Sequence, residues 1–167
     1  MGCIHENLIA EAEAVVERLR ESDLTVVTAE SCTGGLIAAC LSHGKEASRC
    51  FQGGFVVYTK AQKREVLGVN DRLLSEQGAV NTEVARQMAE GAIKRSPASL
   101  AVAVTGVLGP DPDEDNNPPG LIYLGLAQRG KPTTVVRHQA TAVDPDVTRE
   151  WTVLRALQLL KQTAGYG

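Results

Sequence analysis

The run LAVAV at residues 100–104 most constrains the fold of this chain of 167 residues. A strand with one face in water alternates apolar and polar side chains, whereas this run contains no polar residue. Such a strand must be covered on both faces, and in α/β proteins helices provide the cover. We therefore expect residues 100–104 to form a central strand of a sheet that lies between two layers of helices.

Helix and strand patterns alternate along the rest of the sequence. Six segments carry apolar residues at helical spacing, and short apolar or β-branched runs lie between them. The expected helices are residues 5–21, 36–43, 60–67, 71–77, 82–95 and 145–163, and the expected strands are residues 24–28, 55–59, 100–104, 121–127 and 133–139. The last two strands flank Gln128-Arg129-Gly130-Lys131, which is typical of a hairpin turn.

Strands that are joined through helices, together with one hairpin, predict a mixed sheet. The sequence has no internal repeats and no linker long enough to separate two domains. We therefore expect one α/β domain over residues 1–167, folded as a three-layer α/β/α sandwich.

The charge balance and the hydrophobic pattern argue against several classes of partner. The 17 basic and 20 acidic side chains leave no positive excess to hold nucleic acid, although local donors can still bind a small anion. No apolar run approaches the roughly 20 residues of a membrane span. Glu6, Glu11 and Glu13 interrupt the apolar core that a signal peptide requires. We expect a cytoplasmic protein with no membrane or nucleic-acid partner.

Cysteine and histidine are too widely spaced to predict a metal centre. The four cysteines, Cys3, Cys32, Cys40 and Cys50, show no CxxC spacing, which is typical of a reduced cytoplasmic protein. The three histidines lie far apart, so we expect no zinc site. The acidic stretch 111–116 resembles a calcium loop only superficially, because the required glycine and the final glutamate are missing. We expect a solvated turn there and no metal.

The stretch TAESCTGG, residues 28–35, follows an apolar run and leads into a helical pattern. Such a corner places a nucleophile or an anion at the first turn of a helix, where backbone N–H groups are unpaired. From these residues alone Ser31 has two open roles, as the N-cap of the following helix or as a nucleophile. Cys32 is the rival nucleophile, but no histidine lies near it in the sequence. The two glycines suggest a phosphate cradle, yet the Gly-Lys-Ser/Thr ending of a P-loop is missing.

Four other side chains lie where a ligand could reach them. Tyr58 ends one expected strand, and Lys63 follows it by five residues on a short helix. Taken alone, each has a simpler interpretation, as a half-buried strand tyrosine and as a solvated lysine. Thr105 ends the central strand, and strand ends in α/β sheets commonly face ligand crevices. Arg149 lies near the start of the last helix, where the helix dipole does not favour a cation, and its simplest role is that of a surface residue.

Three segments together resemble one known family. TAESCTGGLIA, FQGGFVVYTKAQKREVLGV, and AVAVTGVLGP followed by PPGLIYLGLA are similar to the CinA C-terminal family, which includes bacterial nicotinamide-nucleotide amidases. The resemblance runs from about residue 8 to residue 160. The family's other common component, an N-terminal pyrophosphatase-like domain, has no room in this sequence. The resemblance therefore implies the stand-alone amidase form.

The resemblance implies roles for individual residues. Members of the family are serine amidohydrolases with a Ser/Lys pair. Ser31 matches the serine, and Lys63, five residues after Tyr58, matches the lysine. Thr105 and Arg149 match positions that line the family's site.

In the implied reaction, Ser31 attacks a carboxamide carbon and forms an acyl-enzyme as ammonia leaves, and water then releases the acid. Lys63 must be neutral to take the serine proton, so its pKa must fall from about 10.4 toward about 7–8, through burial or a nearby cation. Arg149 is a candidate for that cation or for a group that binds the substrate, and Tyr58 for a proton relay. The candidate oxyanion donors are the backbone N–H groups of Cys32, Thr33, Gly34 and Gly35.

The leading hypothesis is deamidation of nicotinamide mononucleotide to nicotinic acid mononucleotide, without a cofactor, by a homodimer such as family members commonly form. One segment departs from the family pattern. After Thr105-Gly106 the family usually shows Gly-Pro, a glycine-rich stretch and Lys-Pro-x-Gly, whereas this chain has GPDPDEDNNPPG. Because an acidic loop would repel a phosphate, two alternatives stay open: a non-catalytic nucleotide-binding or interaction module, and an amidase for another carboxamide.

Overall fold

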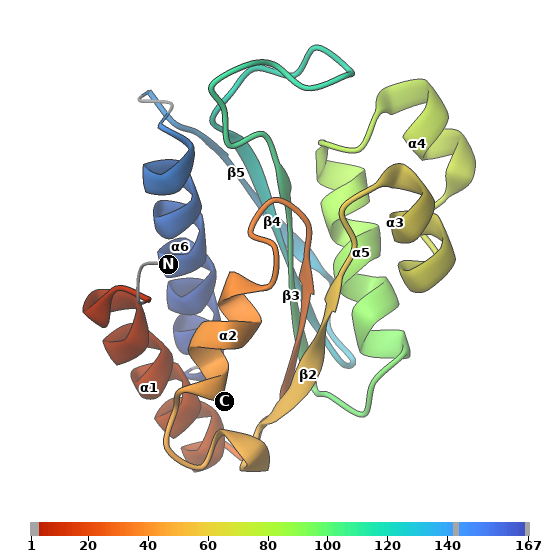
Figure 1. The fold of residues 1–167 in the computed structure, drawn as a ribbon. Coiled ribbons are helices and arrows are strands. Elements are labelled where there is room, and N and C mark those ends of the chain that lie inside the picture. The colour runs from red at the N-terminus through yellow and green to blue at the C-terminus, as the bar shows by residue number, and fades with distance from the viewer. Residues whose placement is uncertain (1–3, 142–143, 166–167) are drawn as a thin grey trace.

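A five-stranded sheet forms the centre of the computed structural model, which describes residues 4–141 and 144–165 (Figure 1). The strands are β1 (Val26–Glu30), β2 (Phe51–Val56), β3 (Leu100–Gly106), β4 (Leu121–Gln128) and β5 (Thr134–Gln139). Their order in the sheet is β2-β1-β3-β4-β5. β2 and β3 pair with β1 in parallel, whereas the pairs β3–β4 and β4–β5 are antiparallel. The sheet is therefore mixed, as expected.

Helices cover both faces of this sheet (Figure 1). One layer contains α1 (Glu6–Glu21), α2 (Leu36–Ser42) and α6 (Pro145–Ala164), and the other contains α3 (Lys60–Leu67), α4 (Asp71–Gln77) and α5 (Thr82–Lys94). A short 3-10 helix, Ala47–Arg49, precedes β2. The expected α/β fold class and its three layers are confirmed. No helix among the described residues is long and apolar enough to cross a membrane.

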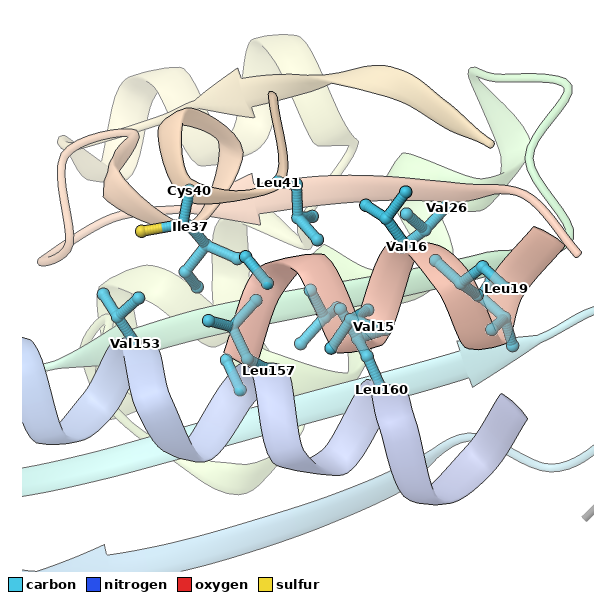
Figure 2. Close-up of a cluster of buried hydrophobic side chains, with 14 of the residues drawn as sticks. Val15, Val16, Leu19, Val26, Ile37, Cys40, Leu41, Val153, Leu157 and Leu160 are labelled. Carbon is cyan, nitrogen blue, oxygen red and sulfur yellow. The ribbon is translucent and has the colours of Figure 1, made fainter. Parts of the chain in front are cut away.

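The central strand β3 contributes side chains to two separate cores. Leu100, Val102 and Val104 pack in the core under α1, α2 and α6, part of which Figure 2 shows. Ala101 and Ala103 pack in the opposite core, under α5. All five residues are buried, because each face of the strand is covered by a helical layer. The absence of a polar residue in this run is thereby explained.

Two of the parallel strands begin and end at different residues from those expected. β1 begins and ends two residues later than residues 24–28, and β2 covers Phe51–Val56 instead of residues 55–59. The reason lies at Gly54, where a Cβ atom would overlap the Thr28 hydroxyl and lie 3.2 Å from the Cβ of Ala38. The glycine therefore lets β2 pack closely against β1 and α2 instead of forming a turn. Residues 57–59 become the connection into α3.

The helix bounds agree with the expectations to within about two residues. The expected hairpin is also present, because β4 and β5 are antiparallel neighbours. Asn81 caps α5, and its side chain accepts from the backbone N–H of Val84 at 2.9 Å. Local capping and turn residues thus fix most boundaries, whereas the bounds of β1 and β2 depend on packing.

Candidate active site

Three parallel strands end side by side at one edge of the sheet. Glu30, the last residue of β1, pairs with Val56 of β2 on one side and with Val104 of β3 on the other. Ser31 follows directly, and its N–H donates to the Val104 carbonyl at 3.2 Å. Carboxyl ends of parallel strands commonly open onto a crevice in which ligands bind. The local structure therefore places Ser31 at such a crevice.

Lys63 contacts Ser31 at this edge although 32 positions separate the two residues in the chain. The distance from Lys63 Nζ to Ser31 Oγ is 2.8 Å. The same nitrogen donates to the backbone carbonyls of Val57 at 3.1 Å and Tyr58 at 3.2 Å. Thr59 caps α3, so the connection from β2 enters the helix with a fixed geometry. Lys63, in the first turn of α3, thereby reaches back to the strand ends.

Burial changes the chemistry of the Lys63 amine. Its side chain is 1% exposed, and burial lowers its pKa to about 8, against opposing effects of Cys32 and Glu114. The lowering comes from burial and not from Arg149, which was the other expected cause. A neutral amine has two hydrogens and one lone pair. The two backbone carbonyls accept the hydrogens, which leaves the lone pair for the Ser31 hydroxyl.

The rival nucleophile, Cys32, lies in an environment that keeps it protonated. Burial raises the pKa of its thiol to about 12, and the positive charge of Lys63 offsets this only in part. The thiolate is the nucleophilic form of cysteine, and a pKa this high leaves almost none of it near neutral pH. The geometry at this corner therefore favours the serine.

The Glu30 side chain, which the sequence pattern did not single out, lies at the N-terminus of α2. The Glu30 carboxylate accepts four hydrogen bonds at 2.6–3.1 Å, from the Thr33 hydroxyl and from the backbone N–H groups of Gly35, Ile37 and Ala38. The N-cap of α2 is Gly35, with a left-handed φ of 98°. The alternative role of Ser31 as an N-cap is therefore wrong, because Glu30 satisfies these donors.

Of the four backbone N–H groups expected as oxyanion donors, two are already bonded within the protein. The N–H of Gly34 donates to the Ser31 carbonyl at 3.0 Å, and the N–H of Gly35 donates to Glu30 at 3.1 Å. Both were expected as oxyanion donors, and these bonds remove them from that role. The N–H groups of Cys32 and Thr33 donate to no backbone carbonyl and no side-chain oxygen in the described part of the chain. These two groups are the remaining candidates for an oxyanion hole.

A cavity of about 680 Å³ opens over the Ser–Lys pair, a volume typical of small-molecule sites. It brings together eight of the nine expected site residues, all but Gly35. The eight are Ser31, Cys32, Thr33, Gly34, Tyr58, Lys63, Thr105 and Arg149. Residues 107–109 and 113–115 of the loop between β3 and β4 form its outer wall.

Three of these side chains have surroundings that bear on their expected roles. Tyr58 is 73% exposed, and its backbone carbonyl, not its phenol, contacts Lys63. The Thr105 hydroxyl donates to the carbonyl of Ala79 at 2.7 Å and so holds the adjacent wall of the cavity. Arg149 pairs with Asp146, one turn earlier in α6, at 2.7 Å. The relay role of Tyr58 and the binding role of Arg149 stay predictions.

The acidic loop is held by its own backbone and by one lysine. The Asp113 carboxylate accepts from the backbone N–H groups of Asp115 and Asn117 and from the Asn117 amide, at 2.8–3.0 Å. Lys60 pairs with Asp115 at 2.7 Å and with Glu114 at 3.2 Å. Asp113 thus acts as the organiser of a turn. The described residues contain no group of three or more His, Cys, Asp or Glu side chains that could hold a metal ion.

Comparisons with known proteins show which family this chain belongs to. The model of the CinA C-terminal domain matches residues 9–164. The chain belongs to this family. A CinA-like protein of Geobacter sulfurreducens is 42% identical over 149 residues, which are 89% of this chain and 36% of that protein. A putative competence-damage inducible protein of Symbiobacterium thermophilum is 48% identical over 119 residues, 71% of this chain and 28% of that protein. This CinA-family chain thus spans about a third of the length of these relatives.

Solved structures of the family share nearly the whole fold. The competence/damage inducible protein CihA from Agrobacterium tumefaciens is 37% identical, with a TM-score of 0.89 over 96% of this chain and 97% of that one. A CinA superfamily protein from Klebsiella pneumoniae is 27% identical, with a TM-score of 0.91 over 97% of this chain and all of that one. The three-layer sandwich is therefore common to this chain and its structural relatives.

Proposed function

We propose that this CinA-family chain is a serine amidohydrolase, with Ser31 as the nucleophile and Lys63 as the general base. The observation that carries the proposal is the 2.8 Å contact between Lys63 Nζ and Ser31 Oγ inside the cavity. A buried amine whose pKa is about 8 is partly neutral at physiological pH, so it can accept the serine proton. This geometry supports an enzyme over a non-catalytic binding module.

The reaction proceeds in two halves. Ser31 Oγ attacks the carboxamide carbon while Lys63 takes its proton, and the N–H groups of Cys32 and Thr33 stabilise the negative oxygen that develops. The protonated Lys63 then gives its proton to the leaving nitrogen, so that ammonia departs and an ester to Ser31 remains. Water attacks this ester with Lys63 again as the base. The carboxylic acid is released, and free Ser31 is regenerated.

The substrate that the family resemblance favours is nicotinamide mononucleotide, which would yield nicotinic acid mononucleotide and ammonia. The cavity volume of about 680 Å³ suits a mononucleotide-sized ligand. Arg149 is the cationic side chain that would reach the phosphate after exchanging its ion pair with Asp146. We further propose that the protein acts as a homodimer in the cytoplasm.

A second candidate, an amidase for a carboxamide without a phosphate, is favoured by the outer wall. Asp113, Glu114 and Asp115 all line the cavity, and Lys60 is already paired with two of them. This wall opposes an anion and suits a cationic or neutral carrier of the carboxamide. Comparing kcat/KM for nicotinamide mononucleotide, its nucleoside without the phosphate, and free nicotinamide distinguishes the two candidates.

Release of ammonia from nicotinamide mononucleotide by the wild type and by Ser31→Ala tests the proposed function. We expect turnover by the wild type and a loss of at least about 1,000-fold in Ser31→Ala. Ser42→Ala, which removes an exposed hydroxyl at the end of α2, is the matched control and should keep full activity. Equal turnover by Ser31→Ala and the wild type would rule out the assigned nucleophile. Binding of the nucleotide without ammonia release from any amide would instead indicate a binding module.

A further inference from the structure

Glu30 is a buried acid directly beside the nucleophile, and the reaction outlined above does not use it chemically. Its side chain is 0% exposed. No lysine or arginine among the described residues forms a salt bridge with it. A buried carboxylate without a cation is unfavourable unless hydrogen bonds compensate its charge. The four donors from the turn and from α2 provide that compensation.

The carboxylate shapes the turn that follows Ser31. Its Oε2 atom accepts from the Thr33 hydroxyl at 2.6 Å and from the N–H groups of Gly35 at 3.1 Å and Ile37 at 3.0 Å, and its Oε1 atom accepts from Ala38 at 2.8 Å. Residues 31–35 therefore wrap around one buried group. Two left-handed glycines, Gly34 with φ 62° and Gly35 with φ 98°, allow so tight a path.

The N–H groups along this turn fall into three sets. Those of Ser31, Gly34 and Leu36 donate to backbone carbonyls, and those of Gly35, Ile37 and Ala38 donate to Glu30. In the described part of the chain, those of Cys32 and Thr33 donate to no backbone carbonyl and no side-chain oxygen, and both residues line the cavity. Thr33 is itself held through its hydroxyl, so the position of one free N–H group depends directly on Glu30.

The same carboxylate determines which part of a substrate can enter the corner. A helix N-terminus with free N–H groups attracts anions. Here the negative charge of Glu30 already occupies that position, so a phosphate would meet a carboxylate there. The charge of Glu30 therefore opposes a phosphate at this corner and does not oppose an uncharged carboxamide.

We propose that Glu30 is a positioning residue, which keeps the N–H groups of Cys32 and Thr33 aimed at the carboxamide oxygen as it becomes negative. The inference rests on the proposed function, because it assigns a role in the same reaction. Its effect falls on the transition state and not on ground-state binding, since the oxyanion exists only after Ser31 has attacked.

A tetrahedral analogue measures this role directly. Ser31 Oγ adds to the boron of pyridine-3-boronic acid and passes its proton to Lys63, which gives a tetrahedral boronate anion with a distinct ¹¹B NMR shift. In Glu30→Gln we expect kcat to fall about 100-fold with KM within about threefold, as for loss of an oxyanion donor. Affinity for the boronic acid should weaken by a similar factor. Affinity for nicotinic acid mononucleotide, which does not react with Ser31, should stay within about threefold.

Two further variants keep the test decisive. Thr33→Val removes the hydroxyl that Glu30 holds but retains the backbone N–H group, and should give a loss of about tenfold in the same direction. Asn70→Ala removes the cap of α4, whose side chain accepts from the N–H of Leu73 at 3.0 Å, away from the cavity lining. It should lower the melting temperature and leave kcat and boronate affinity unchanged. If Glu30→Gln does not fold, as judged by circular dichroism, kcat and boronate affinity of Thr33→Val test the role of Glu30.

The outcomes separate this inference from the proposed function. An active wild type with equal kcat and boronate affinity in the variants would overturn the role of Glu30 and leave the amidase in place. A parallel loss of affinity for boronate and nucleotide would also overturn it, because that loss indicates structural damage alone. A wild type that binds boronate but hydrolyses no amide would reject the proposed substrate chemistry, while the affinities would still test Glu30. A wild type that neither binds boronate nor hydrolyses an amide would overturn both the proposed function and the role of Glu30.

Discussion

The two walls of the cavity are built in opposite ways. The inner wall consists of strand ends, the turn before α2 and the first turn of α3, and its reactive groups are almost fully buried, with Ser31 6% and Lys63 1% exposed. The outer wall is an exposed loop whose acidic side chains pair with Lys60. Burial alters the pKa of Lys63 and fixes its contacts, whereas solvent screens the outer charges. In the proposed reaction, the inner wall therefore carries out the chemistry and the outer wall selects the ligands that reach it.

The largest expected effect comes from removing the base of the inner wall. In Lys63→Met, the amine that takes the Ser31 proton is lost while the aliphatic part of the side chain is kept. We expect kcat for ammonia release to fall by about 1,000-fold or more. Lys131→Met, in the exposed turn between β4 and β5, is the control and should match the wild type. Similar rates for the two variants would break the distinction between the walls.

The burial of Lys63 also predicts how stability depends on pH. The amine has a pKa of about 8 in the folded protein, whereas its ordinary pKa is 10.5. Between these values the unfolded chain binds the proton and the folded chain does not, so stability rises with pH. Below pH 8 both states are protonated, and the folded state bears the full cost of the buried charge. The rise amounts to about 3 kcal/mol between pH 8 and pH 10.5.

Urea unfolding of the wild type and of Lys63→Met at several pH values in this range measures that rise. The difference between the two proteins isolates Lys63 together with its effect on Cys32, because the other titrating groups are present in both. We expect the difference in unfolding free energy to change by about 3 kcal/mol over the range. Parallel curves would show that Lys63 is not buried as a neutral amine.

The smallest effect is expected at the outer wall. Glu114→Gln with Asp115→Asn removes two carboxylates from the cavity and releases Lys60 from its ion pairs. Exposed ion pairs contribute little to stability, so we expect a change below about 1 kcal/mol. KM for nicotinamide mononucleotide should fall severalfold while kcat changes little, because an anion then meets less repulsion. A change confined to kcat would place this loop in the chemistry instead.

The sequence predicts the layers of this fold better than it predicts the geometry of the inner wall. The apolar run at 100–104 requires cover on both faces, and the hairpin residues lie next to each other in the chain, so local patterns suffice. The bounds of β2 were wrong because Gly54 serves the packing of β2 against Thr28 and Ala38, two contacts that no local pattern contains.

The site shows the same limit. The pairing of Ser31 with Lys63 was expected from the resemblance to the family, since burial of a lysine cannot be seen from its neighbours in the chain. Glu30 was missed because its partners lie three to eight residues ahead, on a turn whose path only the structure gives. One signal was present, since a carboxylate before a helix N-terminus is favourable. That signal does not tell which N–H groups remain free.

The protonation of Lys63 tests the central claim about the inner wall most directly. Heteronuclear NMR of the ¹⁵N-labelled lysine amines, with Lys63→Met to assign the signal, follows the titration of this one amine. We predict a titration midpoint near pH 8, as burial requires. A Lys63 amine that titrates near its ordinary value of 10.5 would leave almost no neutral amine at neutral pH and would contradict the account of Ser31 and Lys63 as nucleophile and base.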